Sequence, residues 1–191
     1  MIKTSSHFHL LLAITGASGA RYAARFMEKV KSLPSVRLSI VVSTNGKEVW
    51  NREMQMPLPE SEGWRYYDPL DFSAPFASGS CCADSMLILP CSMGSVARIA
   101  HGISDSLITR AADVQLKERR PLIIVPRESP FNLIHLRNLT QLCESGAIIA
   151  PTSPSFYHQP TSIETLVEPF VDRLLFLCGA TPHYIGYSYQ G

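Results

Sequence analysis

The stretch HLLLAITGASGA, residues 9–20, joins an apolar run to a turn of small residues and decides the fold. Residues 9–14 have the length and composition of a buried strand, and TGASGA (15–20) opens a helix. That helix carries apolar residues at 3.6-residue spacing: Ala23, Phe26, Met27, Val30 and Leu33. A buried strand, a glycine-containing turn and an amphipathic helix in this order are typical of a βαβ unit on a parallel sheet.

The same alternation continues to the end of the chain. Further strands are predicted at 37–43, 85–90, 121–126 and 147–151. Helices are predicted at 45–54, at 92–101, at 105–119, from a start at Ser129-Pro130, and from a capping box of Thr161 and Glu164 to about Gly179. Only residues 55–80 break the pattern; they are rich in proline, serine and aromatics, with a short edge strand expected at WRYY (64–67) and a lid or interface role. The sequence therefore predicts one α/β domain over residues 1–191, with a three-layer, doubly wound parallel sheet.

Composition excludes several classes of protein. The 191 residues carry 17 basic and 16 acidic side chains, a net charge of +1, so a broad nucleic-acid or membrane surface is not expected. The unbroken apolar run near the N-terminus is only Leu10 to Ile14, and no run is long enough to span a bilayer. Five cysteines without metal-ligand spacing predict reduced thiols, no metal and a cytoplasmic location.

Small and hydroxyl-bearing residues follow three of the predicted strands. In an open parallel sheet, ligands bind beyond the carboxyl ends of the strands. TGASGA follows the first strand and CSMGS (91–95) the third, and each opens a helix where an anion could bind. The second strand ends in Ser43 and Thr44 instead of the acid that dinucleotide sites place there. A mononucleotide is therefore favoured, although Ser92 as a plain helix cap remains an alternative.

Basic residues gather in RAADVQLKERRPLIIVPRESP, residues 110–130. Arg110 and Arg127 are expected to converge on one sheet edge. Lys117 shares a helix face with Arg110 but lies about 10 Å further along it, so it is expected to reach the same ligand only across a subunit boundary. Arg119 and Arg120 follow at the end of the helix, where cations suit its dipole.

Together, TGASGA, LPCSMGS, TRAADVQLKERRPLIIVPRESPF and PSFYHQP resemble the UbiX-type flavin prenyltransferases. These are flavodoxin-like, Rossmann-like proteins related to the FMN-dependent cysteine decarboxylases. The resemblance covers about Leu10 to Leu177 and implies transfer of a dimethylallyl group from dimethylallyl phosphate to reduced FMN. The product, prenylated FMN, would serve a UbiD-type decarboxylase. The family implies metal-independent chemistry and a homododecamer whose active sites are shared between subunits.

The resemblance also implies roles for individual residues. FMN would be held by Gly16, Ala17, Ser18, Ser43, Ser92, Met93, Gly94, Ser95 and Arg127, with its phosphate near Arg127. The donor phosphate would be held by Ser78, Gly79, Arg110, Lys117, Tyr157 and Arg173. Catalysis and proton handling would fall to Glu53, Ser18 and Glu128.

The chain departs from the family pattern in its aromatic residues. Phe72 stands where some members have Trp, Ser95 where Thr is common, and a C-terminal Trp is absent, with Tyr184, Tyr187 and Tyr189 as candidate substitutes. The preferred prenyl donor, monophosphate or diphosphate, stays open. Two other functions remain as alternatives: an FMN-dependent cysteine decarboxylase-like enzyme, and a non-catalytic FMN-binding or carrier subunit.

Overall fold

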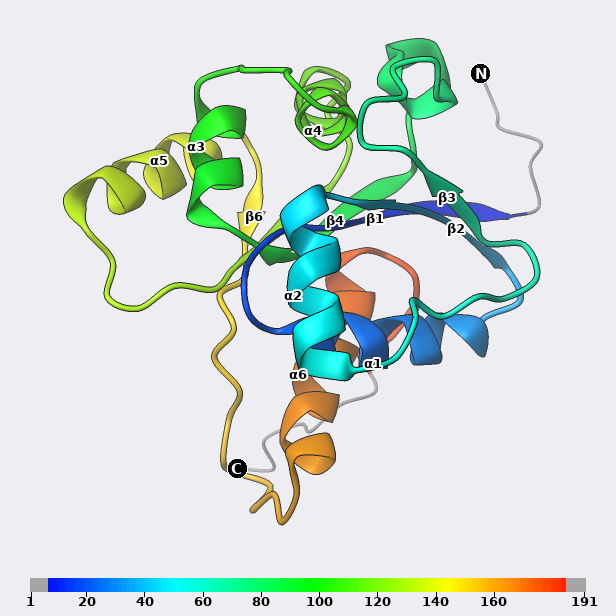
Figure 1. Ribbon diagram of the computed structural model, residues 1–191, viewed down its shortest axis with the longest axis vertical. Helices are drawn as coiled ribbons and strands as arrows, with labels where there is room; N and C mark the ends of the chain where they lie inside the picture. Colours follow the sequence, from blue (N-terminus) through cyan, green and yellow to red (C-terminus); the bar gives the residue numbers. More distant parts are fainter. Residues whose placement is uncertain (1–6, 185–191) are drawn as a thin grey trace.

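The computed structural model describes residues 7–184 and shows a fully parallel sheet of six strands (Figure 1). Their order across the sheet is β3-β2-β1-β4-β5-β6. The strands are β1 (Phe8–Ile14), β2 (Val36–Val42), β3 (Arg65–Tyr67), β4 (Ser85–Cys91), β5 (Leu122–Pro126) and β6 (Ile148–Ile149). The predicted strands are confirmed, including the short edge strand at WRYY. Because the strand order reverses between β1 and β4, the crevice beyond their carboxyl ends is the expected ligand site.

Six α-helices cover the two faces of this sheet. They are α1 (Ala20–Lys31), α2 (Thr44–Met54), α3 (Met93–Ala100), α4 (Leu107–Lys117), α5 (Leu133–Glu144) and α6 (Ile163–Leu177). Helices α1, α2 and α6 pack on one face, and α3, α4 and α5 on the other (Figure 1). The predicted three-layer, doubly wound α/β fold is confirmed. None of the helices within residues 7–184 is long and apolar enough to cross a membrane.

Strand β1 lies at the centre and feeds both cores. Its alternate residues Leu10 and Leu12 pack with α1 and α6, whereas Leu11 and Ala13 pack toward α3 and α4. Successive side chains of a strand point to opposite faces, so a strand covered on both sides must be apolar throughout. This is why the apolar run of residues 9–14 predicted a buried strand correctly.

Two predicted helix starts are wrong. Helix α5 begins at Leu133 instead of Ser129-Pro130, because the side-chain oxygen of Asn132 accepts the backbone N–H of His135 at 2.8 Å. Helix α6 begins one residue later than predicted, with Ser162 and not Thr161 as its N-cap. Neighbouring Ser, Thr and Asn side chains can all cap a helix, and the path of the incoming loop selects among them.

The segment between β3 and β4 packs along α4. It contains two short 3-10 turns, Pro75–Ala77 and Gly79–Cys81. Phe76 is buried and meets the ring of Tyr67 edge to face, with ring centroids 4.9 Å apart. Residues 75–81 are thereby anchored next to α4 and the ion pairs Arg110–Asp113 and Lys117–Glu118. The predicted lid or interface role stays a prediction.

Candidate active site

A cavity of about 600 Å³ opens beyond the carboxyl ends of β1, β2 and β4. Its size is ordinary for a cofactor site. Five of the predicted cofactor-binding residues line it: Gly16, Ser43, Ser92, Gly94 and Ser95. The structure thus brings together, at the reversal of strand order, groups that lie far apart in the sequence.

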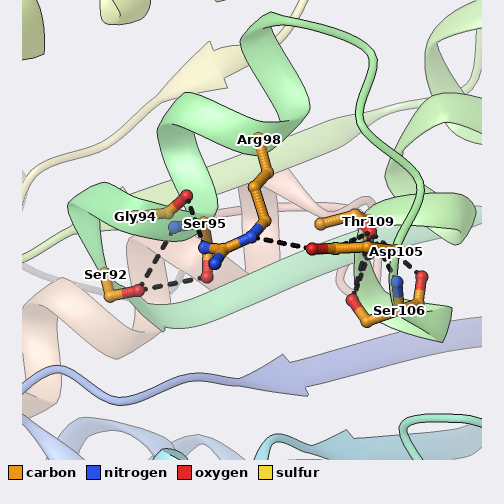
Figure 2. Close-up of polar contacts among 7 residues, drawn as sticks. All are labelled: Ser92, Gly94, Ser95, Arg98, Asp105, Ser106 and Thr109. Carbon is orange, nitrogen blue, oxygen red and sulfur yellow. Dashed lines mark hydrogen bonds and ion pairs between the residues drawn. The ribbon is translucent and has the colours of Figure 1, made fainter.

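Three helices begin at this cavity, each capped by a serine. Ser43, Ser92 and Ser106 accept the backbone N–H groups of Gly46 (3.0 Å), Ser95 (3.3 Å) and Thr109 (3.3 Å), respectively. Figure 2 shows the second and third of these caps facing each other. Ser92 therefore caps α3, which was the alternative to a ligand contact, and it also lines the cavity. Helix N-termini favour an anion, so the cavity suits a phosphate.

Close packing explains two glycines at the cavity. A Cβ on Gly16 would lie 2.5 Å from Cβ of Asn45, and one on Gly46 would lie 2.6 Å from the carbonyl oxygen of Ile14. The loop after β1 therefore contacts the first turn of α2 directly. A side chain at either position would push α2 away from the strand end and change the cavity wall.

Glu53, at the end of α2, caps a different helix. Its Oε2 accepts the backbone N–H groups of Gly19 (3.0 Å) and Ala20 (2.8 Å), the N-cap and the first residue of α1. Partial burial disfavours the charged carboxylate, but hydrogen bonds from Ser18, Gly19 and Ala20 and the charge of Arg127 outweigh it and lower the pKa of Glu53. The carboxylate is therefore ionised at neutral pH and able to accept a proton.

Arg127 and Glu128 follow β5 on the Glu53 side of the strand ends. The backbone N–H of Arg127 donates to the carbonyl of Cys91 at 3.2 Å, and its side-chain charge acts on Glu53. Glu128 is exposed and accepts the N–H of Ser129 at 3.0 Å. Neither residue lines the cavity, nor do the predicted contacts Ala17, Ser18 and Met93. The structure thus groups Ser18, Glu53 and Arg127 into a cluster of their own.

Four of the predicted donor-site residues meet along α4. Arg110 donates from Nε to the carbonyl of Ala77 at 3.0 Å. Lys117 lies beside the start of the second 3-10 turn, since a Cβ on Gly79 would be 2.9 Å from its Nζ. Residues 77–79, the turn that links the two 3-10 turns and contains Ser78, therefore lie along α4 between the two cations. Reasoning from helix geometry alone missed this turn, which gives Arg110 and Lys117 a common neighbour within one chain.

The other two donor-site residues lie elsewhere. Tyr157 is 74% exposed in the loop before α6. Arg173 is on α6, across the sheet from α4, with its guanidinium 5.4 Å from the ring centroid of Phe176 and 5.6 Å from that of Tyr184. Tyr184 thus contacts a predicted substrate residue, whereas Tyr187 and Tyr189 lie outside the described residues. One chain does not bring all six donor-site residues together.

Several polar residues of the cavity were missed by sequence reasoning. They are Asn45, Lys47, Asp68, Arg98, Asp105, Ser106 and Thr109. A signal existed for Ser106, a serine directly before an apolar helical run. Arg98 offered none, because a charged residue on a predicted helix looks the same whether it faces solvent or a ligand.

A nucleotide-sized cavity at the reversal of strand order, with three helix N-termini and no acid at the end of β2, defines a mononucleotide-binding α/β protein. The Flavoprotein family model matches residues 2–174. Flavin prenyltransferase UbiX of Thermoplasma acidophilum is 45% identical over 172 residues, which are 89% of this chain and 94% of the relative. The chain belongs to the flavin prenyltransferase family, as the sequence motifs predicted.

Two solved structures agree with this assignment. A dodecameric FMN-dependent UbiX-like decarboxylase from Escherichia coli O157:H7 superposes with a TM-score of 0.88 at 34% identity, covering 96% of this chain and all (100%) of that one. AnUbiX in complex with FMN and dimethylallyl pyrophosphate has a TM-score of 0.84 at 34% identity, covering 95% of this chain and 100% of that chain.

Proposed function

We propose that this flavin prenyltransferase joins the dimethylallyl group of dimethylallyl phosphate to reduced FMN and releases phosphate. The observation that carries this function is the position of α4. Ile108 and Thr109 line the flavin-sized cavity, whereas the next residue, Arg110, reaches the turn at residues 77–79. A single helix therefore connects a mononucleotide cavity to Arg110 and Lys117. Each is ion-paired at 3.1 Å, with Asp113 and Glu118 respectively, and would exchange that carboxylate for a second phosphate.

The cations on α4 would act on the leaving group. As the bond from the prenyl carbon to the phosphate oxygen breaks, negative charge grows on the phosphate, and Arg110 and Lys117 can stabilise it there. A hydrogen bond to a charged group contributes roughly 1.5–3 kcal/mol, and one that tightens as charge develops lowers the barrier. Reduced FMN supplies the nucleophile that forms the new bond to the prenyl carbon.

Glu53 is the proton acceptor in this proposal. Alkylation of a flavin ring carbon requires a proton to leave it, and an ionised carboxylate is a suitable base. Glu53 contacts the loop after β1, and Gly16 of this loop lines the cavity. The hydrogen bonds from Ser18, Gly19 and Ala20 hold this carboxylate in place and, with a smaller contribution from the charge of Arg127, lower its pKa. Ser18 is the other group of this cluster; Glu128, exposed after β5, keeps only the role that the family resemblance implies.

An allyl cation is stabilised by an aromatic face, and Phe72 is the candidate for this role. Asp68, Pro69 and Leu70 line the cavity, and Phe72 follows them with 48% of its surface exposed. An aromatic face attracts a cation, and Trp does so more strongly than Phe. We propose that Phe72 faces the prenyl group. Because its ring attracts a cation less strongly than that of Trp, it affects the choice of donor.

We further propose that the active sites are completed by neighbouring subunits, in a homododecamer that delivers prenylated FMN to a UbiD-type decarboxylase. Two features support assembly. Arg173 lies across the sheet from Arg110, so a second chain would be needed to bring such residues onto one phosphate. The start of α5 also exposes large apolar side chains, with Leu133 at 60% and Ile134 at 66%; patches of this kind mark interfaces.

Shared sites lead to a prediction on oligomeric state. Light scattering combined with activity measurements is expected to show an oligomer, with activity lost on dilution to monomer. A stable, fully active monomer would contradict the shared site.

The reaction itself can be tested directly. The purified protein is incubated with reduced FMN and either dimethylallyl monophosphate or dimethylallyl diphosphate, and the flavin is weighed by mass spectrometry. We expect the flavin to gain one prenyl unit. Unmodified flavin with both donors, in a preparation that binds FMN, would favour a carrier subunit; loss of carbon dioxide from a cysteine peptide would favour the decarboxylase alternative.

Nucleotide choice gives a further prediction. Strand β2 is followed by Ser43, without an acid to bind a second ribose, so FMN is expected to bind more tightly than NAD or FAD. Titration of the protein with each nucleotide measures this order. Tighter binding of NAD or FAD would place a dinucleotide in the cavity instead.

A further inference from the structure

Arg98 reaches over the cavity from α3 and is held at two points. Its Nε donates to Oδ2 of Asp105 at 3.0 Å, and its Nη1 donates to the carbonyl of Gly94 at 3.1 Å (Figure 2). Its Nη2 has no hydrogen-bond partner within residues 7–184. The side chains of Arg98 and Asp105 are both 50% exposed, so a ligand in the cavity can reach the pair.

The charges on the cavity wall cancel. Lys47 and Arg98 are positive, and Asp68 and Asp105 are negative. A phosphate monoester brings about 1.5–2 negative charges at neutral pH. Helix N-termini offset part of this charge, but a full cation has to turn toward the phosphate to complete the site.

We propose that Arg98 binds the 5′-phosphate of the flavin. Asp105 holds the guanidinium at the cavity wall until the phosphate binds. The inference rests on the proposed placement of FMN in this cavity and identifies which side chain selects the phosphorylated flavin. Arg98 already lies at the wall with one nitrogen available, so little side-chain freedom remains to be lost on binding.

Asp105 has a second partner that allows this exchange. Oγ1 of Thr109 donates to Oδ1 of Asp105 at 3.3 Å, so the carboxylate stays hydrogen-bonded when Arg98 turns away. Gly94 leaves room for the guanidinium, because a Cβ there would lie 3.3 Å from Nη1 of Arg98. The neighbours of Arg98 thus permit both positions of its side chain.

Arg127, the cation expected at the FMN phosphate, has a different neighbour. Its charge acts on Glu53, and it does not line the cavity. The proposal therefore moves the phosphate contact from the end of β5 to α3 and leaves Arg127 to the Glu53 cluster.

The test compares FMN with riboflavin, which lacks the phosphate, by flavin fluorescence titration of the intact protein. Arg98→Ala is expected to weaken FMN binding about 10- to 100-fold, the value of one charge-assisted hydrogen bond, and to leave riboflavin binding within about threefold. Arg98→Lys is expected to restore part of the preference, because the charge remains but the fork of donors does not. Asp105→Asn removes the competing carboxylate charge and is expected to strengthen FMN binding.

Arg37→Ala is the matched control, since it removes one exposed arginine at the opposite end of the sheet, in β2. Unchanged riboflavin binding by Arg98→Ala also shows that the variant is folded. Arg98→Ala that keeps the parent ratio of FMN to riboflavin affinity, or that loses both flavins equally, overturns the inference alone. A parent protein without preference for FMN over riboflavin overturns the phosphate placement as well.

Discussion

Glu53→Gln is expected to slow prenyl transfer about 10²–10⁴-fold while FMN stays bound, the usual effect of losing a general base. The amide keeps the shape of the carboxylate, and its oxygen can still accept the N–H groups of Gly19 and Ala20. It cannot take up the proton that the flavin ring loses. Single-turnover measurement of prenylated flavin, beside an FMN titration, separates the chemical step from binding.

The cap that Glu53 forms on α1 must be separated from its role in catalysis. Removing a negative charge at a helix N-terminus costs roughly 0.3–1 kcal/mol of stability, which thermal unfolding detects. Glu48→Gln is the matched control, an exposed glutamate on the same helix. A Glu53→Gln protein that turns over at the parent rate, with only a lower melting temperature, would leave the carboxylate a purely structural role.

The pKa of Glu53 adds a pH dependence. Because hydrogen bonds from Ser18, Gly19 and Ala20 lower this pKa in the folded protein, the carboxylate stays ionised below the ordinary glutamate range. A group with a depressed folded pKa stabilises the fold above its unfolded pKa, and this stability is lost as pH falls through the folded pKa. The fall in transfer rate at acid pH should therefore occur below the pH range in which an ordinary glutamate titrates. Glu53→Gln should not show this fall.

Arg110→Ala and Lys117→Ala are each expected to reduce use of the prenyl donor about 10- to 100-fold and to spare FMN binding. Each variant removes one charge-assisted contact to a phosphate that carries about 1.5–2 negative charges. Both side chains flank the turn at residues 77–79, and neither lines the flavin cavity. Steady-state rates against donor concentration, with FMN saturating, measure the loss.

Arg119 and Arg120 provide the controls on the same segment. Both are exposed beyond the last turn of α4, and Arg119 has a left-handed backbone with φ of 55°. Replacing either by alanine is expected to change stability or assembly at most. Loss of prenyl transfer in Arg119→Ala, with Arg110→Ala still active, would reverse the assignment of this basic cluster.

The motifs around the strand ends predicted the family, the sheet and five of the sixteen residues within 7–184 that line the cavity. TGASGA and CSMGS were recognisable because small residues after an apolar run already indicate a turn that a ligand can approach. The starts of α5 and α6 were misplaced, since Asn132 and Ser162 compete with equally good capping residues nearby. Lys117 was expected to reach the ligand of Arg110 only across a subunit boundary, and this stays a prediction; helix rise alone did not reveal that residues 77–79 lie near both side chains.

The amino-acid sequence by itself determined the alternation of buried strands and amphipathic helices, because apolar periodicity and turn glycines act over a few residues. It also determined which residue types stand at the strand ends. Only the tertiary structure decided that Glu53 of α2 caps α1, that residues 77–79 join Arg110 to Lys117, and that Arg98 is held by Asp105 over the cavity. These contacts link different elements, so they depend on how helices and loops pack on the sheet and leave no local pattern in the chain.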